Sequence, residues 1–182
     1  MFIGGSALGA SATGANGLTR ADVSVMGSPN GGGSSATILN SASATTTFTA
    51  TATMDVMFAL GYDAFVKAFV NPALGSDAVA SAGINWTLTV TSSNDATFVP
   101  LFWTPSELNV GFTSTDVSEN QQYASAGNLF SLVRTITAGK SYNLTITQSS
   151  NALAQEVPEP ASLALVGLGL LGFGALRRRR QA

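Results

Sequence analysis

The sequence predicts an all-β chain, an antiparallel β-sandwich of jelly-roll-like type, that ends in a single membrane-spanning helix. Three observations lead to this prediction. Apolar and hydroxyl residues alternate in several short runs, Gly, Asn and Ser fill the segments between them, and an uncharged apolar stretch precedes four arginines near the C-terminus. Alternation with a period of two is typical of strands with one buried face, and many short strands with such connections favour a sandwich.

The first alternating run extends from Thr45 to Leu60, with apolar residues on the even positions and mostly threonine on the odd ones. Because the branched threonine side chain favours extended backbone, this run predicts a half-buried strand. A second run, Ala64 to Val70, follows a predicted turn at Gly61-Tyr62-Asp63. Its apolar spacing also fits a short helix from Asp63 to Val70, and the sequence leaves both interpretations open.

Two further runs lie in the middle of the chain. Ile84 to Val90 alternates without interruption and places Trp86 on the apolar face. Thr97 to Trp103 contains Pro100. Because proline has no backbone N–H to donate to a neighbouring strand, this run predicts an edge or bulged strand.

The last two runs, Leu129 to Ile136 and Tyr142 to Thr147, flank a predicted hairpin turn at Ala138-Gly139-Lys140. The alternation assigns one face of each strand to the interior. The side chains predicted to form the core are Phe48, Phe58, Trp86, Leu88, Phe98, Phe102, Leu132, Tyr142, Leu144 and Ile146.

Composition argues against several functional classes. Only 10% of the residues are charged, against about a quarter in average proteins. The residues through Val157 carry four basic and nine acidic side chains, a net charge of −5 that repels a phosphate backbone, so we expect no nucleic-acid partner. Cysteine and histidine are absent, which removes the thiolate nucleophile, the Cys/His zinc site and the commonest general base. We therefore expect no enzyme, no catalytic residue, no cofactor and no metal.

Two polar loops contain the residues that could support catalysis or metal binding instead. Asp116 and Glu119 lie close together in one loop, and Asn94 and Asp95 lie in another. Paired carboxylates can hydrolyse a glycosidic bond, and oxygen-rich loops can hold Ca²⁺. Neither loop has the spacing of a calcium-binding loop, and solvated turn residues explain both of them.

Aromatic side chains offer a second alternative, a platform for carbohydrate. The candidates are Trp86, Trp103, Tyr62 and Tyr123. The alternation of the run Ile84 to Val90 assigns Trp86 to the core. Trp103 lies at a strand end before Thr104-Pro105 and is the better candidate for an exposed aromatic residue.

The C-terminus has three parts in order: Val157-Pro158-Glu159-Pro160, an uncharged apolar stretch from Ala161 to Leu176, and Arg177, Arg178, Arg179 and Arg180. As a helix the apolar stretch is about 24 Å long, slightly short of a hydrocarbon core of about 30 Å, which flanking arginines and local thinning accommodate. Clustered positive charge beside a membrane span stays cytoplasmic, so the arginines set the orientation and place the rest of the chain on the other side.

These three parts resemble a PEP-CTERM sorting domain. The resemblance implies an exopolysaccharide-producing Gram-negative bacterium with an exosortase, a membrane protease that recognises Pro158, Glu159 and Pro160 and cleaves near them. The segment Ile136 to Ile146, shortly before the motif, is also similar in pattern to the final hairpin of many secreted proteins with this tail. The implied partners are the exosortase, the lipid bilayer transiently and extracellular polysaccharide.

We therefore expect an exported structural protein of the cell surface or exopolysaccharide matrix, held briefly in the inner membrane; the alternative is a secreted carbohydrate-binding β-sandwich module. Ala10-Ser11-Ala12 resembles a signal cleavage site, which predicts the rest of a signal upstream, and a flexible terminus explains it equally well. The expected segments are a signal remnant or flexible terminus (1–17), a β-sandwich body (18–150) with a Gly/Ser-rich loop (27–35), a linker with the Pro-Glu-Pro motif (151–160), the membrane helix (161–176) and a basic cytoplasmic tail (177–182).

Overall fold

The computed structural model describes residues 35–70, 78–115, 118 and 120–156. Within these ranges the chain is all-β and every strand pair is antiparallel, as the sequence predicts. The strands are β1 (Ser35–Thr49), β2 (Met54–Val56), β3 (Ala59–Ala68), β4 (Ala78–Ser92), β5 (Leu101–Trp103), β6 (Val110–Ser114), β7 (Gln121–Phe130), β8 (Arg134–Ile136) and β9 (Ser141–Glu156), and the 3₁₀ helix η2 (Ser106–Leu108) lies between β5 and β6.

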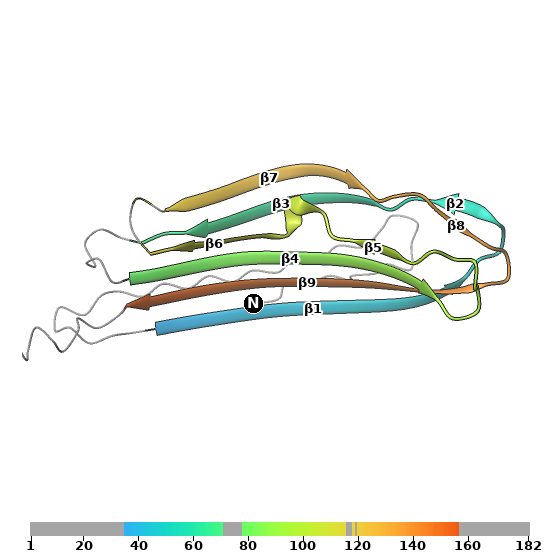
Figure 1. Cartoon of the computed structure of the whole chain (residues 1–182), viewed down its shortest axis with the longest axis horizontal. Coiled ribbons are helices and arrows are strands. Elements are labelled where there is room, and N and C mark those ends of the chain that lie inside the picture. Colours follow the sequence, from blue (N-terminus) through green and yellow to red (C-terminus); the bar gives the residue numbers. More distant parts are fainter. Residues whose placement is uncertain (1–34, 71–77, 116–117, 119, 157–182) are drawn as a thin grey trace, which may run out of the picture.

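Five strands form the main sheet, in the order β1-β9-β4-β5 with β6 also paired to β4 (Figure 1). The last strand, β9, lies between β1 and β4. It pairs with β1 from Ser141 to Gln155 and with β4 from Tyr142 to Glu156. The strand nearest the C-terminal motif is therefore held on both sides along its whole length.

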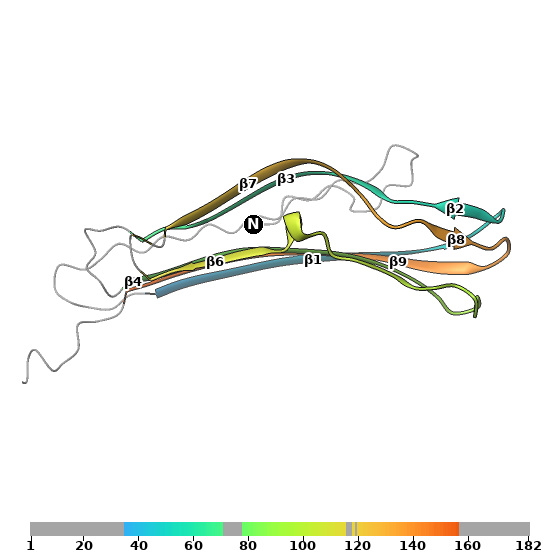
Figure 2. The same cartoon turned by 45° about the horizontal axis from the view of Figure 1, so that its top comes forward.

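The other four strands form a long two-stranded ribbon. β3 pairs with β7, and β2 pairs with β8. Since β2 continues into β3 and β7 into β8, the two pairs follow one another along the same path. The ribbon lies over one face of the main sheet (Figure 2) and contacts it at β4 and β6. The chain thus crosses between two layers that share one apolar core.

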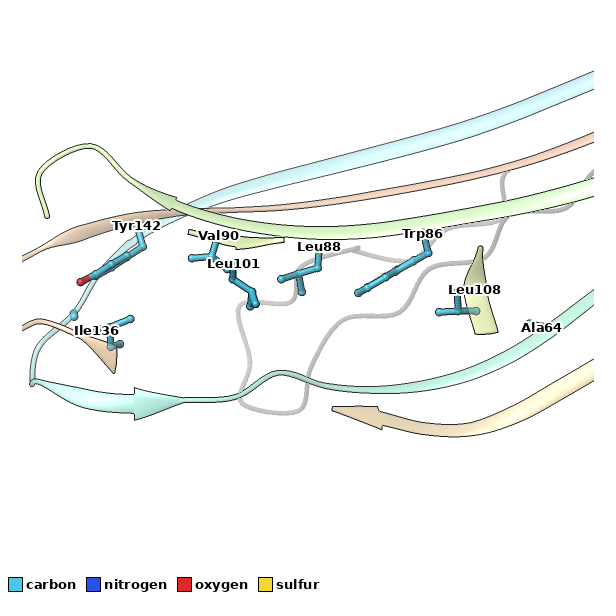
Figure 3. Packing of buried hydrophobic residues seen from close by; sticks show 9 residues of the cluster. Ala64, Trp86, Leu88, Val90, Leu101, Leu108, Ile136 and Tyr142 are labelled. Carbon is cyan, nitrogen blue, oxygen red and sulfur yellow. The ribbon is translucent and has the colours of Figure 1, made fainter. Parts of the chain in front are cut away.

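Alternation on β4 builds the centre of that core. Trp86, Leu88 and Val90 are buried and point from β4 toward the ribbon, where Ile136 of β8 lies near Tyr142 of β9 (Figure 3). Most of the predicted core residues belong to this cluster. Two of them do not, and the prediction is wrong for Phe102 and Leu132, which are 69% and 67% exposed.

Phe102 is exposed because its pairing partner faces outward. It lies opposite Thr89 on β4, and residues opposite each other in antiparallel strands share a face of the sheet. Since Leu88 and Val90 are buried in the core, Thr89 and Phe102 lie on the other face. Apolar character alone did not reveal this register.

Leu132 is exposed because it lies in a bulge of the ribbon. Between the pairs that end β2–β8 and begin β3–β7, residues 57–58 face residues 131–133, so one strand has an extra residue. Ser131 fixes this irregularity: its N–H donates to the carbonyl oxygen of Phe58 at 2.9 Å, and its Oγ accepts from the N–H of Phe58 at 2.9 Å. Such bulges bend a strand, and this one divides the predicted run Leu129 to Ile136 into β7 and β8.

Turns account for the remaining differences. The predicted turn at Gly61-Tyr62-Asp63 and the alternative helix over 63–70 are both wrong, because β3 continues through them and pairs with β7. A turn does lie around Gly139, which has a φ of 74°, a conformation that glycine adopts without steric cost. The predicted hairpin is wrong, because β8 pairs with β2 whereas β9 pairs with β1 and β4, so the turn joins the ribbon to the main sheet. The expected linker is also shorter than predicted, since residues 151–156 belong to β9.

No helix in the described ranges is long and apolar enough to span a membrane. The predicted span, Ala161 to Leu176, lies outside those ranges, as do most of the predicted loop 27–35 and the N-terminal segment 1–17.

We expect Leu88→Ala to lower the free energy of unfolding by about 2–5 kcal/mol, because it removes a side chain that is only 3% exposed and leaves a cavity between the layers. Leu39→Ala is the matched control: Leu39 is 71% exposed on β1, and we expect a change within about 0.5 kcal/mol. Urea unfolding followed by tryptophan fluorescence measures both. Equal effects of the two substitutions would contradict the assignment of the core.

Candidate functional site

The predicted sorting motif follows directly on the main sheet. The last residue of β9, Glu156, still pairs with Ala78 of β4. The motif residues Val157, Pro158, Glu159 and Pro160, the apolar stretch and the arginines all lie outside the described ranges. What the structure does establish is their point of attachment, which is the end of a strand with a neighbour on each side.

The attachment point lies at one end of an elongated body. β9 has 16 residues and, at about 3.3 Å per residue, is about 50 Å long. The turn between β8 and β9 lies at the opposite end (Figure 1). The fold therefore has an end near the C-terminal motif and an end far from it.

The carboxylate of Asp95 belongs to a buried hydrogen-bond network. Its Oδ1 accepts hydrogen bonds from the N–H and the Oγ1 of Thr97, at 3.1 and 2.7 Å, and its Oδ2 accepts one from the hydroxyl of Tyr142 at 2.7 Å. The same tyrosine oxygen accepts from the N–H of Thr137 at 2.8 Å. These bonds connect the loop after β4 with the turn between β8 and β9.

Asp95 is not the solvated turn residue that the sequence suggested, because it is only 8% exposed. The hydrogen bonds from Thr97 and Tyr142 hold the pKa of the Asp95 carboxyl well below its usual range. Beside it, Oδ1 of Asn94 accepts from the N–H of Ser141 at 2.9 Å. The oxygens considered for Ca²⁺ or for hydrolysis in this loop thus make internal bonds that stabilise the fold.

The second acidic pair, Asp116 and Glu119, lies outside the described ranges. Within the part of the chain that the structure describes, no three acidic side chains come together as ligands for a metal ion.

The four candidate aromatic residues contribute to the core or pack against it. Trp86 is buried, as predicted, and Trp103 is half-buried with its ring edge-to-face against it, at 5.3 Å between centroids. The hydroxyl of Tyr123 donates to the carbonyl oxygen of Glu107 at 3.1 Å, and the hydroxyl of Tyr62 lies 2.7 Å from Oγ of Ser125. The structure therefore does not bring these aromatic residues together as an exposed platform.

A polar surface, whose alignment across the strands the sequence analysis did not predict, occupies part of the outer side of the main sheet. Its residues lie in register on three strands, and we call it the hydroxyl face. It consists of Ser43, Thr45 and Thr47 of β1, Thr147, Thr145 and Asn143 of β9, and Thr87, Thr89 and Thr91 of β4.

Hydrogen bonds connect the strands across the hydroxyl face. Oγ1 of Thr45 lies 2.9 Å from Oγ1 of Thr145, and Oγ1 of Thr47 donates to Oδ1 of Asn143 at 2.6 Å. The signal for this face was present in the sequence, as threonine at every second position of three runs. Their pairing in space depends on strand order, which alternation does not reveal.

Comparison with known proteins identifies the C-terminal segment. Residues 156–180 match the model of the PEP-CTERM protein-sorting motif. The chain carries a PEP-CTERM sorting motif. The match begins at the last residue of β9 and includes the Pro-Glu-Pro residues, the apolar stretch and the arginines that the sequence analysis singled out. The PEP-CTERM motif supports an exported protein that is targeted to an exosortase, a membrane protein, on its way to the cell surface.

Other comparisons add little to the PEP-CTERM assignment. No curated protein matches the chain. A solved structure of infectious bursal disease virus, Gx strain, is 14% identical over 87% of this chain and 48% of that one, with a TM-score of 0.11. The chain thus spans about half the length of that viral chain, and a likeness at this score carries no argument about the fold.

We expect the Asp95 network to make stability fall in acid. Because the pKa of Asp95 is lower in the folded chain than its unfolded value of about 3.9, its contribution is present above about pH 4 and is lost as the pH falls toward the folded value. We expect the free energy of unfolding, measured with urea at pH 7, 4 and 3, to fall less in acid for Asp95→Asn than for the wild type. Identical pH profiles for the two chains would show that this carboxylate does not contribute.

Proposed function

We propose that this chain is an exported, non-enzymatic structural protein of the cell surface or exopolysaccharide matrix of a Gram-negative bacterium. The observation that carries the proposal is the PEP-CTERM motif at residues 156–180, which begins where the folded body ends. The stretch from Ala161 to Leu176 holds the chain in the inner membrane, and the arginines at 177–180 stay in the cytoplasm. An exosortase then cleaves near Pro158-Glu159-Pro160 and releases the body.

The short distance between body and membrane supports cleavage close to the bilayer. Only residues 157–160 separate the last residue of β9 from the proposed membrane helix. The two prolines in this segment restrict φ and disfavour helix in the residues before them. A segment of this composition suits a membrane protease that binds extended chain, and it follows a strand with a neighbour on each side.

The surface of the body supports a structural role after release. We propose that the two layers form a jelly-roll-like β-sandwich with the hydroxyl face on its outer side. This face carries no charge, and its hydroxyl and amide groups can exchange hydrogen bonds with water and with neutral polysaccharide. The internal hydrogen bonds of Asp95 are consistent with an absence of catalysis in that loop.

The alternative function is a secreted carbohydrate-binding module. The hydroxyl face supports it, because donors and acceptors repeat there in register across three strands. The four candidate aromatic residues give it no support, since they pack in or against the core. The two functions differ in whether the hydroxyl face binds a glycan directly.

Processing is tested by the C-terminal mass of the chain recovered from the membrane and extracellular fractions of a host with an exosortase. We expect an extracellular species that ends near Pro158 to Pro160 and that disappears when Pro158, Glu159 and Pro160 are all changed to alanine. The matched control is Asp63→Ala with Pro100→Ala, which removes an exposed acid and an exposed proline from the body. A membrane species that ends at Ala182 in every variant would show that the tail is a permanent anchor.

Glycan binding is tested by changing one row of the hydroxyl face. In the variant Thr45→Val, Thr145→Val and Thr89→Val, the branched shape is kept and three neighbouring hydroxyl groups are lost. For a carbohydrate-binding module we expect weaker retention on immobilised host polysaccharide, by about tenfold if the lost hydrogen bonds together contribute about 1.4 kcal/mol. Thr51→Val with Thr104→Val, at exposed positions outside the strands, is the control. Unchanged retention of the row variant would exclude this face as the binding site.

A further inference from the structure

β1 forms an edge of the main sheet. Among the described strands only β9 pairs with it. The pairing continues without a bulge through all 15 residues, from Ser35 opposite Gln155 to Thr49 opposite Ser141. On the side that faces away from β9, the backbone donors and acceptors of β1 follow one another in a long, regular row, and no other described strand pairs with them.

The residues of β1 itself lack the features that usually prevent edge strands from pairing. Natural proteins protect edges with charged residues, proline, bulges or short strands. β1 contains no charged residue and no proline. The other edge of the main sheet is formed by the short strands β5 and β6, and in the ribbon β3 carries Asp63 and Lys67. β7 is also uncharged, but it has 10 residues and ends at the bulge.

The charge distribution favours a second copy of this chain as the occupant. The residues through Val157 have a net charge of −5, so two bodies repel each other at most orientations. The three long strands of the main sheet are the exception: β1, β4 and β9 contain no charged residue before Glu156. Two copies that meet along β1 therefore bring no like charges opposite each other on these strands.

We propose that two copies of this chain pair through β1, antiparallel about a twofold axis, and form one continuous sheet. A twofold axis places the same strand of both copies in the interface. The side chains on the outer face of β1 are mostly serine and threonine, which fit opposite their own kind. The hydroxyl face of one copy then continues into that of the other.

Antiparallel pairing also determines whether the dimer can form before or after the tail is removed, and this point rests on the proposed function. β9 runs antiparallel to β1, so the two C-terminal ends lie at opposite ends of the paired sheet, with the length of β1, about 50 Å, between them. Two copies that stand on one membrane by their tails point β1 in the same direction. Removal of the tail frees the copies to pair.

Single cysteines test the pairing directly, because the chain has no native cysteine. Ser41→Cys, Ala42→Cys and Ser43→Cys are introduced one at a time into the full-length chain in detergent and into the species released by the host. Two fully overlapping copies of β1 place its middle residue, Ala42, at the twofold axis. Antiparallel pairing therefore predicts a disulfide-linked dimer for Ala42→Cys and little for its two neighbours. Cross-linking at all three positions would indicate parallel pairing and would overturn the proposal.

Thr145→Cys and Ala126→Cys are the matched controls, on interior β9 and on β7. Cross-linking through Ala126 with none through β1 would assign the contact to the ribbon. A disruptive variant, Ser43→Lys, adds a charge to an exposed position of the edge. We expect it to halve the mass measured by sedimentation while the tryptophan fluorescence stays unchanged.

A wild-type chain that sediments as a monomer overturns the proposal. Because full-length chains in detergent do not share a bilayer, pairing is measured there even without cleavage. A dimer in detergent together with no cleaved species in the host would overturn the processing step and leave the pairing intact.

Discussion

The pairing of β9 on both sides is the interaction on which the rest of this structure depends. β9 brings β1, the first described strand, into the same sheet as β4, and it aligns the threonines of three strands into the hydroxyl face. Its inner side contributes Tyr142 to the core. Its last residue is the first residue of the sorting motif. The same strand thus links the architecture of the body with the segment that directs its export.

The Asp95 network completes this arrangement at the far end of the sheet. Tyr142 begins the inner face of β9, and its hydroxyl connects Asp95 with the backbone of the turn at Thr137. A buried carboxylate is costly unless hydrogen bonds satisfy it, and here three donors do so. The ionised carboxylate of Asp95 therefore holds the loop after β4 in position. An acidic residue with this structural role looks, in the sequence alone, like a candidate for a metal-binding or catalytic site.

The sequence predicted the strands whose two faces differ most. Trp86, Leu88 and Val90 alternate with threonine, and β4 buries the face that this alternation predicts. Prediction failed where the pattern was weaker or depended on distant residues. The turn expected at Gly61 is strand because β7 pairs with it, and Phe102 faces outward because Thr89 does. The bulge at 131–133 depends on a serine that bonds across the ribbon. The sorting motif was recognised because its parts are contiguous, whereas the hydroxyl face joins residues about 100 positions apart.

The attachment of the tail to β9 has a mechanical consequence. Under the proposed function, in which the tail is held in the membrane, a flow that drags on the body pulls β9 along its own axis. The hydrogen bonds to β1 and β4 lie across that axis, so the load acts on them in shear, and many must break together before the strand slides. A tail attached to an edge strand and pulled sideways would instead open its bonds one after another. The tail is thus joined to the strand best suited to resist detachment by force, and under the proposed function proteolysis is the easier route of release.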